Sequence, residues 1–175
     1  IKQGRKIALA NKESLVACGD LLIEISKTTS SEIIPLDSEH SAIWQCIKNE
    51  EDKYVKSIVI TASGGSLRDM PINELSSVTP EIVLNHPTWN MGDKITVDSA
   101  TLINKVFEVK EAANLFDIPL EDIEVIFHDE SIIHGMANMV DGNSLALLSE
   151  PNMRIPILYA LFYPKRVMSK NIKKI

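Results

Sequence analysis

Two periodicities in the hydrophobic pattern divide the chain into alternating helices and strands. Apolar residues spaced three or four positions apart predict helices, located at residues 12–27, 41–48, 78–85 and from about Ile155 onward. Short β-branched runs predict strands, located at residues 32–36, 55–62 and 123–128. The run at 55–62 is almost wholly apolar, which is typical of a strand buried on both faces.

A turn signal late in the chain adds an antiparallel hairpin. Asp141 and Gly142 separate two apolar runs at residues 131–140 and 144–149, and an Asp-Gly pair is a strong signal for a tight hairpin turn. Strands joined through helices favour parallel pairing instead. The expected fold class is therefore α/β, with a mixed sheet flanked by helices, and 175 residues are enough for one domain.

The longest helix is expected to run from about residue 98 to Phe116. Asp98 or Ser99 can cap its N-terminus. Exposed N–H groups at such a helix start attract anions, so Ser99 is a candidate contact for a phosphate group. The apolar face expected to turn toward the core contains Val106, Val109 and Ala113.

A polar stripe follows the same helix. Asn104 and Lys105 lie four and three positions before Glu108, so the three side chains share one face. Lys105 could add a positive charge to a phosphate site. A solvated Lys–Glu surface pair explains the stripe as well, and it is the simpler interpretation of the helix alone.

Two acids interrupt the apolar pattern in the stretch IIPLDSEHSAIWQ, residues 33–45. In an extended chain Asp37 and Glu39 would point the same way and Ser38 the other way. Two adjacent carboxylates repel each other unless a cation lies between them, and a hard divalent ion such as Mg²⁺ or Mn²⁺ suits their oxygen atoms. The alternative is a helix cap by Asp37 or Ser38 with Glu39 in the first turn. The local sequence by itself favours the cap.

Two loops could border a ligand. ITASGGS, residues 60–66, follows the buried strand, and its small residues with the Ser63 and Ser66 hydroxyls would let a ligand approach closely. A simple strand-to-helix turn explains its glycines equally well. NHPTWNMG, residues 85–92, combines His86, Trp89 and Met91 in a loop of the kind that closes over a bound ligand.

Composition excludes several classes of function. The net charge of −6 and the pI of about 5.2 argue against nucleic acid as a partner. Two cysteines without CxxC spacing provide neither a disulfide scaffold nor a zinc site, and they fit a reducing, cytoplasmic compartment. No apolar run approaches the roughly 20 residues of a membrane span, so no membrane association is expected.

Five blocks in this order resemble the 1-deoxy-D-xylulose 5-phosphate reductoisomerase family: LANKESLVACG, PLDSEHSAIWQ, ITASGGSLRD, HPTWNMGDKITVDSATLINKVFEV and ESIIHGMANMVDGNSLALLSEPNMRIPI. The resemblance extends from about Ile7 to Arg166. It implies an enzyme that depends on NADPH and a divalent metal. The implied reaction rearranges the substrate skeleton and reduces the product to 2-C-methyl-D-erythritol 4-phosphate in the non-mevalonate isoprenoid pathway.

The resemblance also implies a role for each matching residue. Asp37, Glu39 and Glu108 would hold Mg²⁺, Mn²⁺ or Co²⁺. The phosphorylated substrate would contact Ser38, Ser63, His86, Ser99, Asn104 and Lys105. Asn11, Lys12 and Glu13 would lie where the cofactor and substrate sites meet, with Met91 near the nicotinamide and Trp89 beside it in the flap. Lys12, Glu39 and His86 would act in catalysis, and His134 matches a further family histidine.

The resemblance further implies an excised central domain. Residues 1–10 would end an NADPH-binding domain, residues 11–166 would form the catalytic domain, and residues 167–175 would begin a linker to a helical domain. A homodimer in a bacterial cytoplasm is implied, and little turnover is expected from this fragment alone. Two alternatives stay open from the residues themselves: a metal-dependent phosphosugar hydrolase, and a non-catalytic oligomerisation module.

Overall fold

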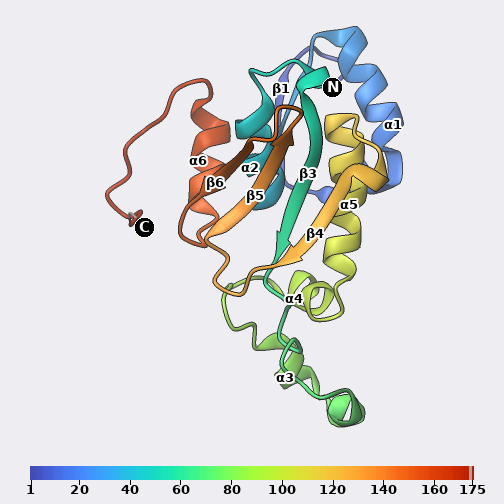
Figure 1. The fold of residues 1–175 in the computed structure, drawn as a ribbon, viewed down its shortest axis with the longest axis vertical. Coiled ribbons are helices and arrows are strands. Elements are labelled where there is room, and N and C mark those ends of the chain that lie inside the picture. The colour runs from blue at the N-terminus through green and yellow to red at the C-terminus, as the bar shows by residue number, and fades with distance from the viewer. Residues whose placement is uncertain (174) are drawn as a thin grey trace.

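A four-stranded mixed sheet forms the centre of the computed structural model, which describes residues 1–173 and 175 (Figure 1). Its strands lie in the order β4-β3-β5-β6. β3 pairs in parallel with β4 and antiparallel with β5, and β5 pairs antiparallel with β6. The strands are β3 (Val55–Ala62), β4 (Ile123–Phe127), β5 (Ile133–Met139) and β6 (Ser144–Leu148). The predicted α/β class with a mixed sheet is confirmed.

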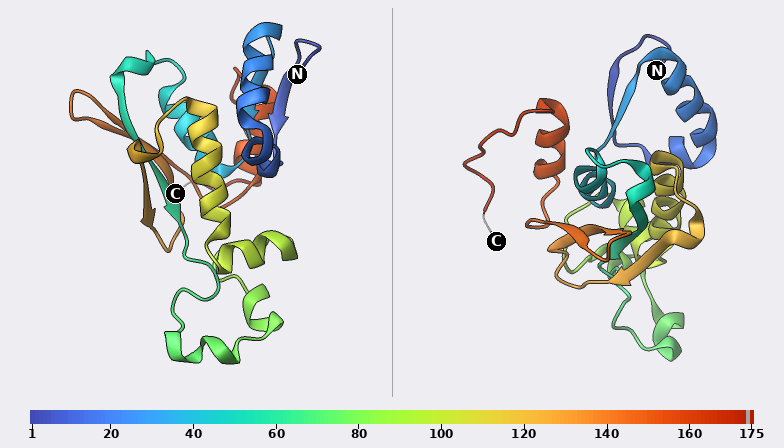
Figure 2. Two further views of the ribbon diagram at one scale, coloured as in Figure 1. Left: turned by 90° about the vertical axis from the view of Figure 1, so that its right-hand side faces the viewer. Right: turned by 45° about the horizontal axis from the view of Figure 1, so that its top comes forward.

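Helices cover one face of this sheet (Figure 2). α2 (Ser38–Ile47) packs on β5 and β6, and α5 (Ile103–Phe116) lies beside it, with α1 (Lys12–Thr29) outside α5. The buried core joins these layers through Ile43, Ile58, Ile60 and Ala112. Their alternation on β3 places Ile58 and Ile60 on the helix-covered face.

Two smaller parts flank the central layers. β1 (Lys6–Leu9) and β2 (Glu32–Pro35) form a separate two-stranded parallel sheet joined by α1. Residues 63–100 form an arm below the sheet, which Figure 1 shows in green, containing the 3₁₀ helix η2 (Ile72–Ser77), α3 (Pro80–Leu84) and α4 (Asp93–Ala100). α6 (Arg154–Phe162) follows the hairpin, and the short 3₁₀ helices η1 (Asp52–Tyr54) and η3 (Leu120–Asp122) precede β3 and β4.

The hairpin and the short helix at residue 80 confirm two local predictions. Gly142 adopts φ +91° between β5 and β6, a conformation that glycine reaches without steric cost. Thr79 is the N-cap of α3 and Pro80 is its first residue.

Candidate functional site

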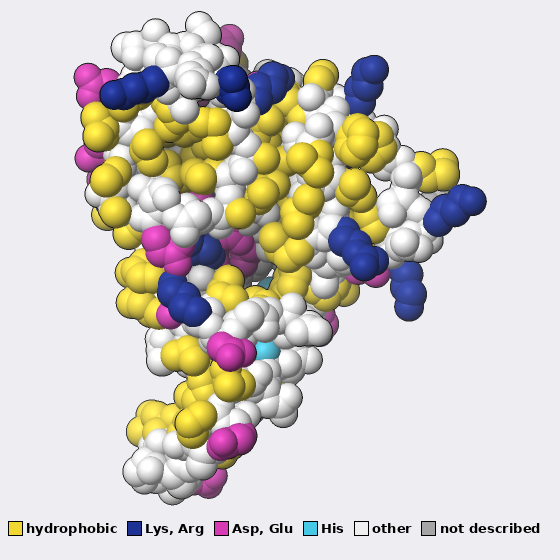
Figure 3. All heavy atoms as spheres, turned by 180° about the vertical axis from the view of Figure 1, so that it is seen from behind, with side chains coloured by type: hydrophobic (Ala, Val, Ile, Leu, Met, Phe, Trp, Pro, Cys, Tyr) yellow, Lys and Arg dark blue, Asp and Glu magenta, His cyan; other side chains and the backbone are white. Residues whose placement is uncertain are grey.

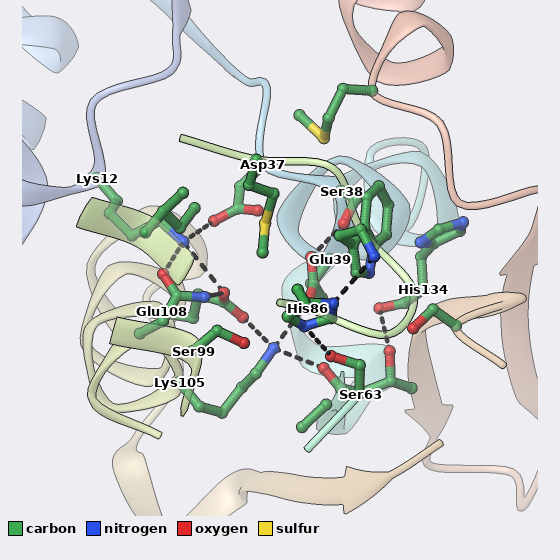
Figure 4. A pocket seen from close by; sticks show the side chains of 18 of the residues that line it. Lys12, Asp37, Ser38, Glu39, Ser63, His86, Ser99, Lys105, Glu108 and His134 are labelled. Carbon is green, nitrogen blue, oxygen red and sulfur yellow. Dashed lines mark hydrogen bonds and ion pairs between the residues drawn. The ribbon is translucent and has the colours of Figure 1, made fainter. Parts of the chain in front are cut away.

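A pocket of about 170 Å³ opens where the C-terminal end of β3 meets the starts of α1 and α2 and one side of α5 (Figure 4). In parallel α/β arrangements, loops at strand ends gather side chains from distant parts of the chain. Figure 3 shows charged side chains bordering a hollow between the body and the lower arm. The pocket lies at this junction.

The start of α2 brings two acids to the pocket. Asp37 occupies the N-cap position and Ser38 and Glu39 form the first helical turn, so the interpretation as an extended segment is wrong. The cap position is the one that the local sequence favoured, yet the Asp37 side chain makes no capping hydrogen bond. Both carboxylates turn into the pocket instead, which a pure capping role does not explain.

The polar stripe of α5 is buried rather than solvated. Lys105 is 9% exposed and Glu108 1% exposed, which excludes a simple surface ion pair. Val106 is 59% exposed, so the prediction that it faces the core is wrong, whereas Val109 packs against the core as expected. Compared with the predicted orientation, α5 is rotated about its axis, so that its polar stripe lines the pocket.

Three carboxylates converge at this point. Oxygen atoms of Asp37, Glu39 and Glu108 all lie within 4.8 Å of one another, although Glu108 is about 70 positions from the other two. Such a set of hard oxygen donors fits one divalent ion of the Mg²⁺ or Mn²⁺ class. The structure therefore brings the three predicted metal ligands together.

Two lysines bridge the carboxylates. Lys12 Nζ lies 2.5 Å from Asp37 Oδ2 and 3.1 Å from Glu108 Oε1, and it donates to Asn104 Oδ1 at 2.8 Å. Lys105 Nζ contacts Glu108 and lies 2.8 Å from Glu39 Oε1. Three carboxylates against two ammonium groups leave an excess of negative charge that attracts a further cation.

The electrostatics of the cluster follow from burial and charge. Burial alone would lower the pKa of Lys12 and of Lys105, but the adjacent carboxylates outweigh it and raise both pKa values. Burial and the neighbouring Glu39 raise the pKa of Glu108. For Asp37, burial is opposed by Lys12 and His40, which lower the pKa below its usual range.

Ser63 and His86 form the opposite wall of the pocket. His86 Nδ1 accepts hydrogen bonds from the backbone N–H groups of Thr88 (3.1 Å) and Trp89 (2.9 Å). Nδ1 therefore carries no proton, and the proton of the neutral ring belongs to Nε2, which donates to Ser63 Oγ at 3.2 Å. Burial, with a smaller effect of Arg68, lowers the pKa of His86 and favours this neutral form.

Ser99 lines the pocket from a different position than expected. It lies in the last turn of α4, and a separate helix, α5, begins at Ile103 after Leu102 in the left-handed conformation. The prediction of one helix capped by Asp98 or Ser99 is therefore wrong. The loop after β3 contributes to this arrangement: Gly65 has φ +73° and packs so tightly that a Cβ atom there would lie 2.4 Å from Ser99 O.

The remaining predicted residues divide into two groups. Ser38, Trp89, Met91 and His134 line the pocket, and the Trp89 and His134 rings meet edge to face at 6.1 Å. Asn11 and Glu13 lie outside the lining and near the surface: Asn11 caps α1 through Ser14, and Glu13 pairs with Lys94. Thr61, Ala62 and Gly64 also line the pocket, within the stretch 60–66 that the sequence indicated as a ligand border. Sequence reasoning missed lining residues elsewhere in the chain, namely Ala10, Leu36, Ile95, Leu102, Ser131 and Met153. Most of these are apolar or lie in loops, where no local signal marks a ligand contact.

Comparison with known proteins identifies this arrangement. Residues 33–116 match the model of the 1-deoxy-D-xylulose 5-phosphate reductoisomerase C-terminal domain. The chain is 54% identical to the enzyme of that name from Bacillus pumilus and 53% identical to the one from Desulforamulus reducens, in each case over 166 residues, 95% of this chain. The chain belongs to the 1-deoxy-D-xylulose 5-phosphate reductoisomerase family.

The reductoisomerase match covers only part of the relatives. The chain spans 43% of the length of each of these two enzymes. The matching model describes the C-terminal domain of the family, which corrects the expectation of a central domain.

Two solved reductoisomerase structures share the fold. One, a complex with NADPH, fosmidomycin and magnesium, superposes with a TM-score of 0.92 at 42% identity over 97% of this chain and 44% of that one. The other, from Zymomonas mobilis in complex with NADPH, has a TM-score of 0.88 at 44% identity over 98% of this chain and 44% of its own. In the described part of the present chain, no helix is both long and apolar enough to cross a bilayer.

Proposed function

We propose that this chain, through residues 11–166, is the catalytic part of an enzyme that converts 1-deoxy-D-xylulose 5-phosphate to 2-C-methyl-D-erythritol 4-phosphate in non-mevalonate isoprenoid biosynthesis. The observation that carries the proposal is the convergence of Asp37, Glu39 and Glu108 in one pocket of a reductoisomerase fold. The reaction would rearrange the carbon skeleton and then reduce it with NADPH.

The three carboxylates would hold Mg²⁺, with Mn²⁺ and Co²⁺ as alternatives. When bound, the ion supplies stabilisation of negative charge that develops on the substrate oxygens during the rearrangement. Ser38, buried beside Glu39 and hydrogen-bonded to it, would contact the substrate next to the ion. Glu39 would act in catalysis as well as in metal binding.

The opposite wall would bind the phosphate group. Ser63, Ser99 and the neutral ring of His86 face the pocket, and Asn104 and Lys105 approach it from α5. Lys105 now neutralises Glu39 and Glu108. A divalent ion would take over that neutralisation, which would leave the Lys105 ammonium group available to the phosphate.

NADPH would enter beside the start of α1. Lys12 would supply the positive charge near the reacting carbons, Asn11 and Glu13 would lie where the cofactor and substrate sites meet, and Met91, which lines the pocket, would lie near the nicotinamide. Trp89 and Met91 would belong to a flap that excludes water from the reaction. His134, adjacent to Trp89, would support the closed position.

Assembly and location belong to the same proposal. The hairpin β5–β6 would form a homodimer contact, because β6 is an edge strand of the sheet. Cys18 and Cys46 are both free thiols, which fits the reducing interior of a bacterial cytoplasm.

A domain exchange tests the function. The 166 matching residues of the Bacillus pumilus relative are replaced by those of this chain, and NADPH oxidation is followed with 1-deoxy-D-xylulose 5-phosphate and Mg²⁺. The chimera is expected to turn over, and the same chimera with Glu108→Gln is expected to lose most of its activity. Release of inorganic phosphate without NADPH oxidation would instead support a phosphosugar hydrolase. A folded chimera without either activity would contradict the catalytic proposal.

A further inference from the structure

A second polar cluster lies directly behind the three carboxylates, away from the pocket. His40 on α2 is completely buried and Glu111 on α5 is 2% exposed. His40 Nδ1 lies 3.7 Å from Asp37 Oδ2 and 3.5 Å from Glu111 Oε2. Neither His40 nor Glu111 lines the pocket, so direct contact with the substrate does not explain them.

The His40 ring touches two of the proposed metal ligands from behind. Its Nε2 atom lies 2.9 Å from the backbone oxygen of Glu108, which can only accept, so Nε2 is the donor. Its Nδ1 atom faces the Asp37 side chain. The ring is stacked on Phe116 with centroids 6.2 Å apart and planes inclined by 26°, which restricts its rotation.

Burial of unpaired polar atoms makes this cluster destabilising for the folded protein. Within the described part of the chain, His40 Nδ1 and Glu111 Oε2 have no hydrogen-bond partner, and both atoms are shielded from solvent. An unpaired buried polar group destabilises the folded state, because it has given up its hydrogen bonds to water. The two carboxylates flank Nδ1 at distances longer than hydrogen bonds, so a small movement of Asp37 would bring it into contact with the ring.

His40 links the two acids by position. Its Nδ1 atom lies between the carboxylate of Asp37, at the start of α2, and that of Glu111, on α5. Ligand atoms of Asp37, His40 and Glu111 all lie within 4.8 Å of one another. A change at Glu111 or His40 therefore acts directly on the position of the Asp37 carboxylate.

We propose that Glu111 and His40 are positioning residues that fix the Asp37 carboxylate and the Glu108 backbone for the divalent ion. Partners of this kind that hold metal ligands in place typically contribute about 10–100-fold to metal affinity. The inference rests on the proposed function, because it requires that the three carboxylates bind a metal. It adds two residues outside the pocket, His40 and Glu111, to those that determine the geometry of the metal site.

Titration of the 175-residue chain with Mn²⁺, followed by the electron paramagnetic resonance signal of free Mn²⁺, tests this role. Glu111→Gln removes the charge without changing the shape, and His40→Gln can keep the bond to the Glu108 backbone while it loses contact with Asp37. Each is expected to weaken Mn²⁺ binding about 10–100-fold at a stoichiometry of one ion per chain. Ile43→Val, one turn after His40 on α2 and fully buried, is the matched packing control and should leave the affinity unchanged.

The outcomes distinguish failure of this inference from failure of the proposed metal site. If Glu111→Gln and His40→Gln lower the melting temperature but bind Mn²⁺ as the wild type does, the two residues are merely structural and the inference is overturned. Two ions per wild-type chain would also overturn it, because Asp37, His40 and Glu111 would then hold an ion of their own. A wild-type chain that binds no Mn²⁺ would contradict the metal site of the proposed function, and the inference with it. If Glu111→Gln fails to fold, His40→Gln decides alone.

Discussion

The ammonium group of Lys12, at the start of α1, lies 2.5 Å from the carboxylate of Asp37, at the start of α2. Their side chains are only 8% and 15% exposed. This pair connects the segment that precedes the sheet to the proposed metal site. It also means that a positive charge already neutralises part of the carboxylate cluster when no metal is bound.

Replacement of Lys12 by Met should therefore destabilise the metal-free protein. Loss of one partner from a buried ion pair typically costs about 3–5 kcal/mol in the free energy of unfolding. Mn²⁺ should recover part of this loss, because it would neutralise the carboxylates in place of the lysine. Urea denaturation with and without Mn²⁺ measures both effects.

Lys94→Met is the matched control for Lys12→Met. Lys94 also pairs with two acids, Glu13 and Asp98, but its side chain is 62% exposed. Surface pairs contribute only about 0–1 kcal/mol, so this variant should be close to the wild type. Equal stability of the two variants would contradict the role assigned to Lys12.

A second prediction concerns Gly65 in the loop after β3. Gly65→Ala should destabilise the protein for two reasons. Gly65 has φ +73°, where an alanine is strained, and its Cβ atom would lie 2.4 Å from Ser99 O and clash with α4. The variant should lose more than about 1 kcal/mol of stability. Its affinity for inorganic phosphate should also fall, because Ser63 and Ser99 would be displaced. Thermal denaturation and calorimetry measure the two losses.

Gly142→Ala separates the strain from the clash. Gly142 has a similar φ of +91°, but a Cβ atom there meets nothing within 4 Å. Gly142→Ala should therefore lose stability only through backbone strain, and its affinity for inorganic phosphate should equal that of the wild type. The proposed packing of Gly65 on α4 would be wrong if both variants behaved alike.

A third prediction follows from the pKa of His86, which burial and Arg68 lower below its ordinary value. The folded state binds fewer protons than the unfolded state at this residue, so its contribution to stability is complete above the unfolded pKa of about 6.5. That contribution is lost as the pH falls through the lower, folded pKa. Protonation of Nδ1 would break the bonds from Thr88 and Trp89 and release the loop.

The measurement compares the wild type with His86→Gln by urea denaturation at about pH 8 and at about pH 5, on either side of the ordinary histidine pKa. The wild type should lose more stability than the variant between the two pH values. Tryptophan fluorescence, to which both Trp44 and Trp89 contribute, should change over the same range only in the wild type, where the loop that contains Trp89 is released. An identical loss of stability in both proteins would show that other groups, such as His134, cause the pH dependence.

The sequence predicted the elements well and the orientation of the helices less well. Local signals located β3, α3 and the hairpin: a β-branched run, apolar residues at helical spacing in residues 78–85, and Asp-Gly in a turn. Val106 was misplaced because hydrophobicity alone assigns apolar residues to the core. The face of α5 that packs inward contains Glu108 and Glu111, which are buried together with their partners.

The site was predictable only where residues could be matched to a family pattern. The local sequence around Asp37 is the same whether this residue binds a metal or caps a helix, because Asp37 occupies the N-cap position of α2 in both cases. The split between α4 and α5 depends on Leu102 in a left-handed conformation and on the close approach of Gly65 to Ser99. Both are tertiary features, which no propensity encodes.

The last prediction concerns the free edge of the sheet. Among the residues that the structure describes, β6 is paired on one side only, by β5, and Leu145 and Leu148 are 38% and 48% exposed there. An exposed apolar edge strand is a template for pairing with another chain. The protein should therefore sediment as a dimer, and Leu148→Lys should shift it to the monomer, because a charge at the edge opposes pairing. Leu161→Lys on α6, at a residue that is 67% exposed, is the matched control and should remain dimeric. A monomeric wild type, or dissociation by both variants alike, would contradict the assignment of the dimer contact to β6.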